Sequence, residues 1–98
     1  MNQPRIKKEI VTRLTRILSI LSCLSPTRKV GVDDLMEKVP EIKGIAYGRR
    51  TLQRDLTMLC EYLPIQHDGS SPRGYRLPNT AEGHALQELS SKVAEYFR

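Results

Sequence analysis

Apolar residues recur at helical spacing in several stretches of the chain, and the first runs over about residues 5–24. There, isoleucines and leucines fall three or four positions apart, while Lys, Thr, Arg and Ser occupy the opposite face. This period predicts an amphipathic helix. The Ser25-Pro26 pair would end the helix, because a proline disfavours helical geometry in the residue before it.

A short second helix is expected after a brief extended segment at residues 29–32. Asp33 has the residue type that caps helix N-termini, and Pro40 would stop the helix. We expect the loop over residues 40–48 to be anchored to the core by its apolar side chains. These are Ile42, Ile45 and Tyr47.

The third helix, expected over about residues 48–63, has two different faces. Four leucines at helical spacing predict a buried stripe. At about 100° per residue, the opposite face collects side chains that can contact bases and phosphates. This face consists of Arg50, Gln53, Arg54 and Thr57.

Two short strands are expected over about residues 64–68 and 74–77, separated by turn-forming residues. They predict a β-hairpin with a polar, basic tip. Thr80 would then cap a last amphipathic helix that either folds back on the core or pairs with a second copy. We therefore expect a mainly α fold with a small β-hairpin wing, namely a winged helix-turn-helix domain over residues 1–78 and a C-terminal amphipathic helix over residues 79–98.

The charge distribution indicates a polyanionic partner. The net charge is +5, and it is concentrated in two blocks, +6 over residues 1–30 and +3 over residues 43–76. The intervening segment, residues 31–42, carries −3. At least one strongly basic face is therefore expected, as in proteins that bind nucleic acid.

Other chemistry finds little support in the sequence. Cys23 and Cys60 are far apart, and neither lies near His67 or His84, so no zinc-ligand spacing is present and no metal or cofactor is expected. Asp55 is expected to pair with Arg13 or Arg16. We do not expect an enzyme, because no nucleophile with a nearby base or phosphate-binding loop is evident. No apolar run approaches the roughly 18 residues of a membrane span, so a cytoplasmic protein is expected.

The motifs at residues 48–56, Gly-Arg-Arg-Thr-Leu-Gln-Arg-Asp-Leu, and 74–77, Gly-Tyr-Arg-Leu, resemble the DeoR-type winged helix of the WYL-domain transcriptional regulators. The resemblance covers roughly residues 10–90. It implies a recognition helix at the first motif and a wing closed by the second. The loop before the first motif is longer by about six residues, and Gly48 replaces the usual capping Ser. The chain also stops where a WYL domain would follow, which leaves a stand-alone module and a piece of a longer protein as alternatives.

The expected DNA contacts follow from residue chemistry. Arg bridges guanine and Gln bridges adenine, so Arg50 and Gln53 suit base edges, while the first turn of the helix and the hairpin suit phosphates. The expected DNA-contacting set is Arg49, Arg50, Thr51, Gln53, Arg54, Thr57, Arg73 and Arg76.

We thus expect a sequence-specific regulator of transcription that binds double-stranded DNA, a repressor because nothing resembles an activation segment. A homodimer on a palindromic operator would double the short site that one copy reads. Its expected interface comprises Leu86, Leu89, Val93, Tyr96 and Phe97. The alternative is a winged-helix docking module in a larger assembly. The Arg-Gln-Arg stripe argues against it, because a docking helix more often carries apolar residues there. No small-molecule ligand is expected.

Overall fold

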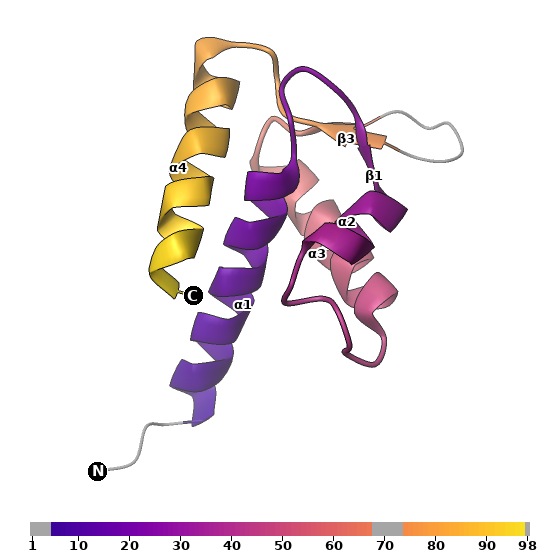
Figure 1. Cartoon of the computed structure of the whole chain (residues 1–98), viewed down its shortest axis with the longest axis vertical. Helices are drawn as coiled ribbons and strands as arrows, with labels where there is room; N and C mark the ends of the chain where they lie inside the picture. The colour runs from indigo at the N-terminus through magenta and orange to yellow at the C-terminus, as the bar shows by residue number, and fades with distance from the viewer. Residues whose placement is uncertain (1–4, 68–73, 98) are drawn as a thin grey trace.

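The computed structural model describes residues 5–67 and 74–97, without the side chains of residues 5–7 and 97. Two long helices lie side by side and antiparallel, and the shorter elements pack beside the first of them (Figure 1). Over these residues the chain is mainly helical, with a small three-stranded antiparallel sheet. The elements are α1 (Arg5–Cys23), β1 (Val30–Gly31), α2 (Val32–Lys38), α3 (Gly48–Tyr62), β2 (Gln66–His67), β3 (Gly74–Arg76) and α4 (Ala81–Phe97).

The sheet has the order β1-β3-β2, so β3 is its central strand. Gln66 pairs with Arg76 in the hairpin, and Val30 of β1 pairs with Tyr75 on the other edge. The expected hairpin strands and the expected extended segment at residues 29–32 are therefore confirmed, although β2 is shorter than predicted. Successive strand residues point to opposite faces, so Val30 and Tyr75 are buried, whereas Lys29 is exposed and Arg76 is half-buried.

The hydrophobic core lies between the C-terminal half of α1, α2, α3 and the inner face of the sheet. All three leucines of α3 at positions 52, 56 and 59 are buried in it, which confirms the predicted stripe. Because α3 is held along its whole apolar face, its opposite face has a fixed orientation. The largest fully buried apolar side chains are Ile20, Leu24, Leu35, Ile42, Leu52, Leu56 and Leu77.

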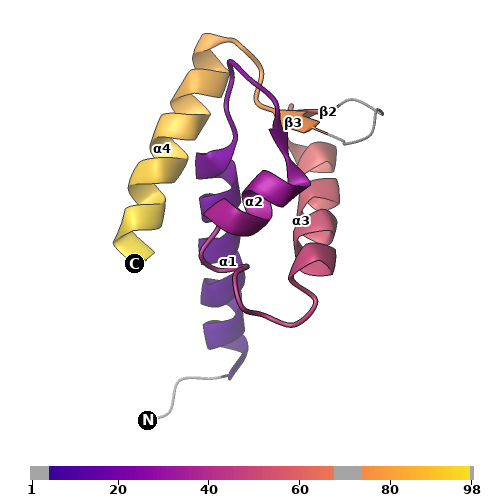
Figure 2. The ribbon, with the colours of Figure 1, turned by 45° about the vertical axis from the view of Figure 1, so that its right-hand side comes forward.

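The N-terminal half of α1 lies outside this core. Every side chain from residue 8 to residue 14 is exposed, including Ile10, Val11 and Leu14. The apolar stripe of α1 is therefore buried only from about Ile17 to Leu24, and it continues uncovered toward the N-terminus. Figure 2 shows the first turn of α1 extending below the other helices and the loop before α3.

Helix α4 docks on its own chain, largely through small and polar residues. As expected, Thr80 caps it, since its Oγ1 accepts a hydrogen bond from the Gly83 amide at 3.2 Å. Gln87 Nε2 donates to the carbonyl of Leu24 at 2.7 Å and satisfies an unpaired carbonyl at the end of α1. Ser90 and Ala94 are buried. A stripe of small residues thus allows close approach to the body.

Two local expectations are wrong. Helix α2 begins two residues earlier than predicted, with Gly31 rather than Asp33 as N-cap and no side-chain cap hydrogen bond. Asp33 instead lies in the first turn, where the helix dipole favours an acidic group. In the loop over residues 39–47, Ile42 is buried as expected, but Ile45 and Tyr47 are exposed and do not anchor the loop.

Candidate nucleic-acid interface

Helix α3 presents a polar, basic face to solvent. Arg50, Gln53, Arg54 and Thr57 are all exposed, as predicted from their spacing. Figure 2 shows α3 at the edge of the molecule, on the side opposite α4. Within residues 5–67 and 74–97, no carboxylate pairs with the guanidinium of Arg50 or Arg54. The two arginines therefore have their hydrogen-bond donors available for an external acceptor.

The hydroxyl of Thr57 donates to the Gln53 carbonyl at 2.9 Å within the helix, so it can offer an external partner only an acceptor. Thr51, the other predicted threonine, is half-buried in the first turn. The side-chain amide of Gln53 has no partner among the described residues, so it can offer both a donor and an acceptor. The central part of this face is thus Arg50, Gln53 and Arg54.

A buried ion pair sets the orientation of α3 on α1. Arg16 Nε donates to Asp55 Oδ2 at 2.5 Å, and its Nη2 donates to Oδ1 at 3.3 Å. The side chain of Asp55 is fully buried and that of Arg16 is 14% exposed. The expected pairing of Asp55 is therefore confirmed, with Arg16 as the partner. Arg16 is consequently not available to a phosphate.

Arg49, at the start of α3, is already engaged. Its Nη2 pairs with Asp33 in the first turn of α2, and both side chains are largely exposed. An exposed pair of this kind contributes about 0–1 kcal/mol, so a phosphate could displace the carboxylate. Sequence reasoning missed this contact, because it depends on the angle between two helices joined by an irregular loop.

The N-terminus of α3 has unusual geometry. Tyr47 is the N-cap residue, has φ of 63° in the left-handed region and makes no side-chain cap hydrogen bond. Gly48 follows at a point of close approach, where a Cβ atom would lie 3.0 Å from the Ile42 carbonyl oxygen. The loop thus passes directly under the first turn of α3. The glycine at position 48 serves this packing and is not itself the cap.

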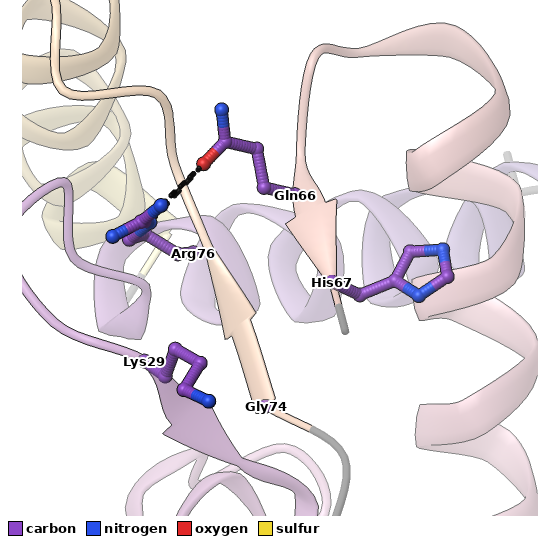
Figure 3. Close-up of a pocket in the computed structure, with 5 residues that line it drawn as sticks. All are labelled: Lys29, Gln66, His67, Gly74 and Arg76. Atoms are coloured by element: carbon purple, nitrogen blue, oxygen red, sulfur yellow. Dashed lines mark hydrogen bonds between the residues drawn. The ribbon is translucent and has the colours of Figure 1, made fainter. Parts of the chain in front are cut away.

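The outer face of the sheet carries a second polar surface. A cavity of about 470 Å³ is lined by Lys29, Gln66, His67, Gly74 and Arg76. Arg76 Nε and Nη2 both donate to Gln66 Oε1, at 3.1 and 2.8 Å, which holds the guanidinium across the hairpin. Figure 3 shows Lys29 and Arg76 on one side of β3 and His67 on the other.

The predicted DNA-contacting residues thus fall into two groups. Arg49, Arg50, Gln53 and Arg54 lie together on α3, whereas Arg76 lies on the sheet beside Lys29 and Gln66. Lys29 and Gln66 were not predicted, because only the pairing of β1 and β2 with β3 brings them next to Arg76. Arg73 lies outside the described residues.

The described residues offer few other kinds of site. No group of three or more His, Cys, Asp or Glu side chains among them could hold a metal ion. None of the helices in the described ranges is long and apolar enough to cross a membrane. Comparison of the chain with known protein families, with curated proteins and with solved structures found no match.

Proposed function

We propose that the chain is a winged helix-turn-helix protein that binds double-stranded DNA and regulates transcription, acting as a repressor. The observation that carries the proposal is the exposed face of α3, where Arg50, Gln53 and Arg54 stand on a helix whose other face is fixed in the core. Arg and Gln are the side chains that bridge guanine and adenine in the major groove. A rigid helix that displays them is suited to reading sequence.

The order of the elements supports the winged-helix part of the proposal. In that arrangement α2 and α3 form the helix-turn-helix, with α3 as the recognition helix. The hairpin of β2 and β3 is the wing, and β1 completes the sheet on β3. The motifs at residues 48–56 and 74–77 then fall on the recognition helix and on the end of the wing, as the resemblance to DeoR-type winged helices implies.

The two basic surfaces have different roles in this proposal. Arg50 and Gln53 read base edges, while Arg54 and the amides of the first turn of α3 contact phosphates. Arg76 and Lys29, on the sheet, contribute positive charge toward the backbone beside the groove. A homodimer places two recognition helices on a palindromic operator, about one helical turn (roughly 34 Å) apart.

A selection of binding sites from a random duplex pool, at moderate salt, tests the proposal. We expect an enriched palindrome whose half-sites lie about one helical turn apart. A pool that stays random would contradict sequence-specific binding and would favour the docking-module alternative. Repeating the selection with Arg50→Ala and Gln53→Ala should relax the preference at individual base positions.

Affinity measurements on the selected site separate the roles of the side chains. Arg50→Ala should weaken binding roughly 5- to 150-fold, the loss of one bidentate base contact. Arg54→Ala should weaken all duplexes alike and reduce the log–log salt slope by about one. Arg28→Ala removes an exposed cation in the segment between α1 and β1, outside both α3 and α4, and is the matched control. If Arg50→Ala and Arg28→Ala behaved alike, the assignment of α3 would be wrong.

A further inference from the structure

Helix α4 has apolar side chains on both of its faces. The face that docks on the chain includes the buried Ser90 and Ala94 and the partly buried Leu86 and Val93. In contrast, Leu89 is 61% exposed and Tyr96 is 88% exposed. A helix that docks on its own chain normally buries its largest apolar residues. This helix leaves two of them in solvent, which indicates a further contact.

Helix α1 has the same property at its N-terminal half. Ile10, Val11 and Leu14 are 60%, 42% and 43% exposed, and they continue the stripe that is buried farther along α1. Helical turns without tertiary contacts are only marginally stable in water. Both views of the ribbon show the C-terminal end of α4 beside the middle of α1, just above these turns (Figures 1 and 2).

We propose that these residues of α1 and α4 form the interface between two copies of this chain. The interface is a four-helix arrangement in which α1 of each copy lies on α4 of the other. The inference deepens the proposed function, since it rests on the proposed homodimer and names its surface, but its test uses no DNA. The α1–α4 surface comprises Ile10, Val11, Leu14, Leu89 and Tyr96.

The exposed area matches what a dimer needs. At roughly 200 Å² for a fully exposed large side chain, the exposed fractions of these five residues amount to about 600 Å² per copy. Two copies would bury about 1,200 Å², the lower end of the range for specific interfaces.

Charge favours a second copy in this crossed arrangement. Apart from Arg16, which is paired with the buried Asp55, the sequence of α1 holds four basic residues and one acidic one, whereas that of α4 holds three acidic residues and one basic one. Contact of α1 with α4 of the second copy therefore brings a positive helix against a negative one. Contact of α1 with α1, or of α4 with α4, would instead bring charges of the same sign together. A two-fold axis repeats the contact, as an isologous interface requires. In this arrangement Ile10 of one copy lies near Leu89 of the other, and Leu14 lies near Tyr96.

The arrangement modifies the interface expected from sequence. Leu86 packs partly against the core of its own chain, and Val93 is half-buried, so neither is a principal contact. The side chain of Phe97 is outside the described residues. Three residues of α1 enter the interface instead. They were overlooked in the sequence because the stripe of α1 is continuous, and only the fold shows which part of it is covered.

Sedimentation equilibrium of the full chain without DNA tests the proposal at protein concentrations of roughly 1–100 μM, which detect dissociation constants in the micromolar range or below. The expected mass is twice the 11.2 kDa of one chain. Tyr96→Glu, Leu89→Glu and Ile10→Glu should each weaken association at least about 30-fold, as central contacts do. Tyr62→Glu is the matched control, because Tyr62 is 77% exposed on α3. A monomeric wild type, or equal effects of Tyr96→Glu and Tyr62→Glu, would overturn the proposal.

Cross-linking distinguishes the crossed arrangement from one in which the two α4 helices meet. Ile10→Cys and Leu89→Cys chains, each with Cys23→Ala and Cys60→Ala, are treated with a short bifunctional thiol reagent separately and as a mixture. The proposal predicts cross-linked dimers in the mixture and few in either chain alone. Efficient cross-linking of Leu89→Cys with itself would overturn it. Circular dichroism on each chain checks that the fold is kept, and DNA binding is scored separately, so failure of one proposal leaves the other testable.

Discussion

The pair of Arg16 and Asp55 joins two helices through charges that are almost completely removed from water. Replacing Asp55 by Ala leaves the Arg16 guanidinium unpaired at a site where its side chain is only 14% exposed. Loss of one partner of a buried ion pair typically costs 3–5 kcal/mol, as a rough guide, because the remaining charge is desolvated and uncompensated. The total stability of a domain of this size is on the order of 5–15 kcal/mol, so the variant should be close to unfolding.

Urea denaturation followed by circular dichroism measures the effect. With a denaturant slope of about 1–3 kcal/mol/M, a loss of this size lowers the midpoint by roughly 2 M. Alanine has a higher helix propensity than aspartate, so the substitution favours α3 locally and the measured loss is a lower limit for the pair. The matched control is Asp33→Ala, which removes the acidic partner of an exposed ion pair and should cost at most about 1 kcal/mol.

The double variant Arg16→Met with Asp55→Leu separates the pair from its surroundings. If burial of an unpaired charge causes the loss, the double variant should recover most of the stability, because apolar replacements of buried ion pairs are often neutral or stabilising. If Asp55→Ala shifted the midpoint no more than Asp33→Ala, or if the two single losses simply added in the double variant, the reasoning would be refuted.

Other predictions concern the glycines, the start of α3 and the contact of Arg49. Gly83→Ala should destabilise the docking of α4 by more than about 2 kcal/mol in thermal unfolding, because the new Cβ would lie 1.8 Å from the Pro78 carbonyl oxygen; no change would mean that α4 docks differently. Tyr47→Gly should raise stability by up to about 1 kcal/mol, since it relieves a positive φ while losing little burial; a clear loss would show that the Tyr47 ring contributes to packing. Under the proposed function, Asp33→Asn should tighten DNA binding several-fold at low salt by releasing Arg49, and the gain should vanish at high salt.

Much of this fold follows from periodicity. The apolar stripes of α1 and α3 predict both helices and the buried side of α3. The sequence also limits the expected partner of Asp55 to Arg13 or Arg16, which lie about one helical turn apart. Those features depend on local spacing and on the cost of burying an unpaired charge. The pairing of the strands was harder to predict from the sequence. A two-residue strand such as β1 has almost no hydrophobic pattern of its own, and its position is set by its contact with β3.

The face of α4 that docks on the chain could not be predicted from hydrophobic periodicity. Ser90 and Ala94 have little hydrophobicity, so hydrophobic periodicity does not mark them as buried, whereas it places the exposed Leu89 and Tyr96 in the same stripe as the partly buried Leu86 and Val93. Close packing of two helices selects for small size, a property that hydrophobic periodicity does not measure. Ile45 and Tyr47 are exposed because the loop is already held to the core by Val39 and Ile42, both of which are buried.

The separation of the two faces of α3 has an evolutionary consequence. The main buried contacts of this helix come from Leu52, Asp55, Leu56 and Leu59, while the side chains at positions 50, 53 and 54 are exposed. Substitutions on the outer face are therefore nearly neutral for stability, usually within about 0.5 kcal/mol. Single substitutions in the course of evolution could therefore change what the helix recognises, and each successive variant would remain folded. Selection on recognition and selection on folding act on different residues of the same fifteen-residue helix.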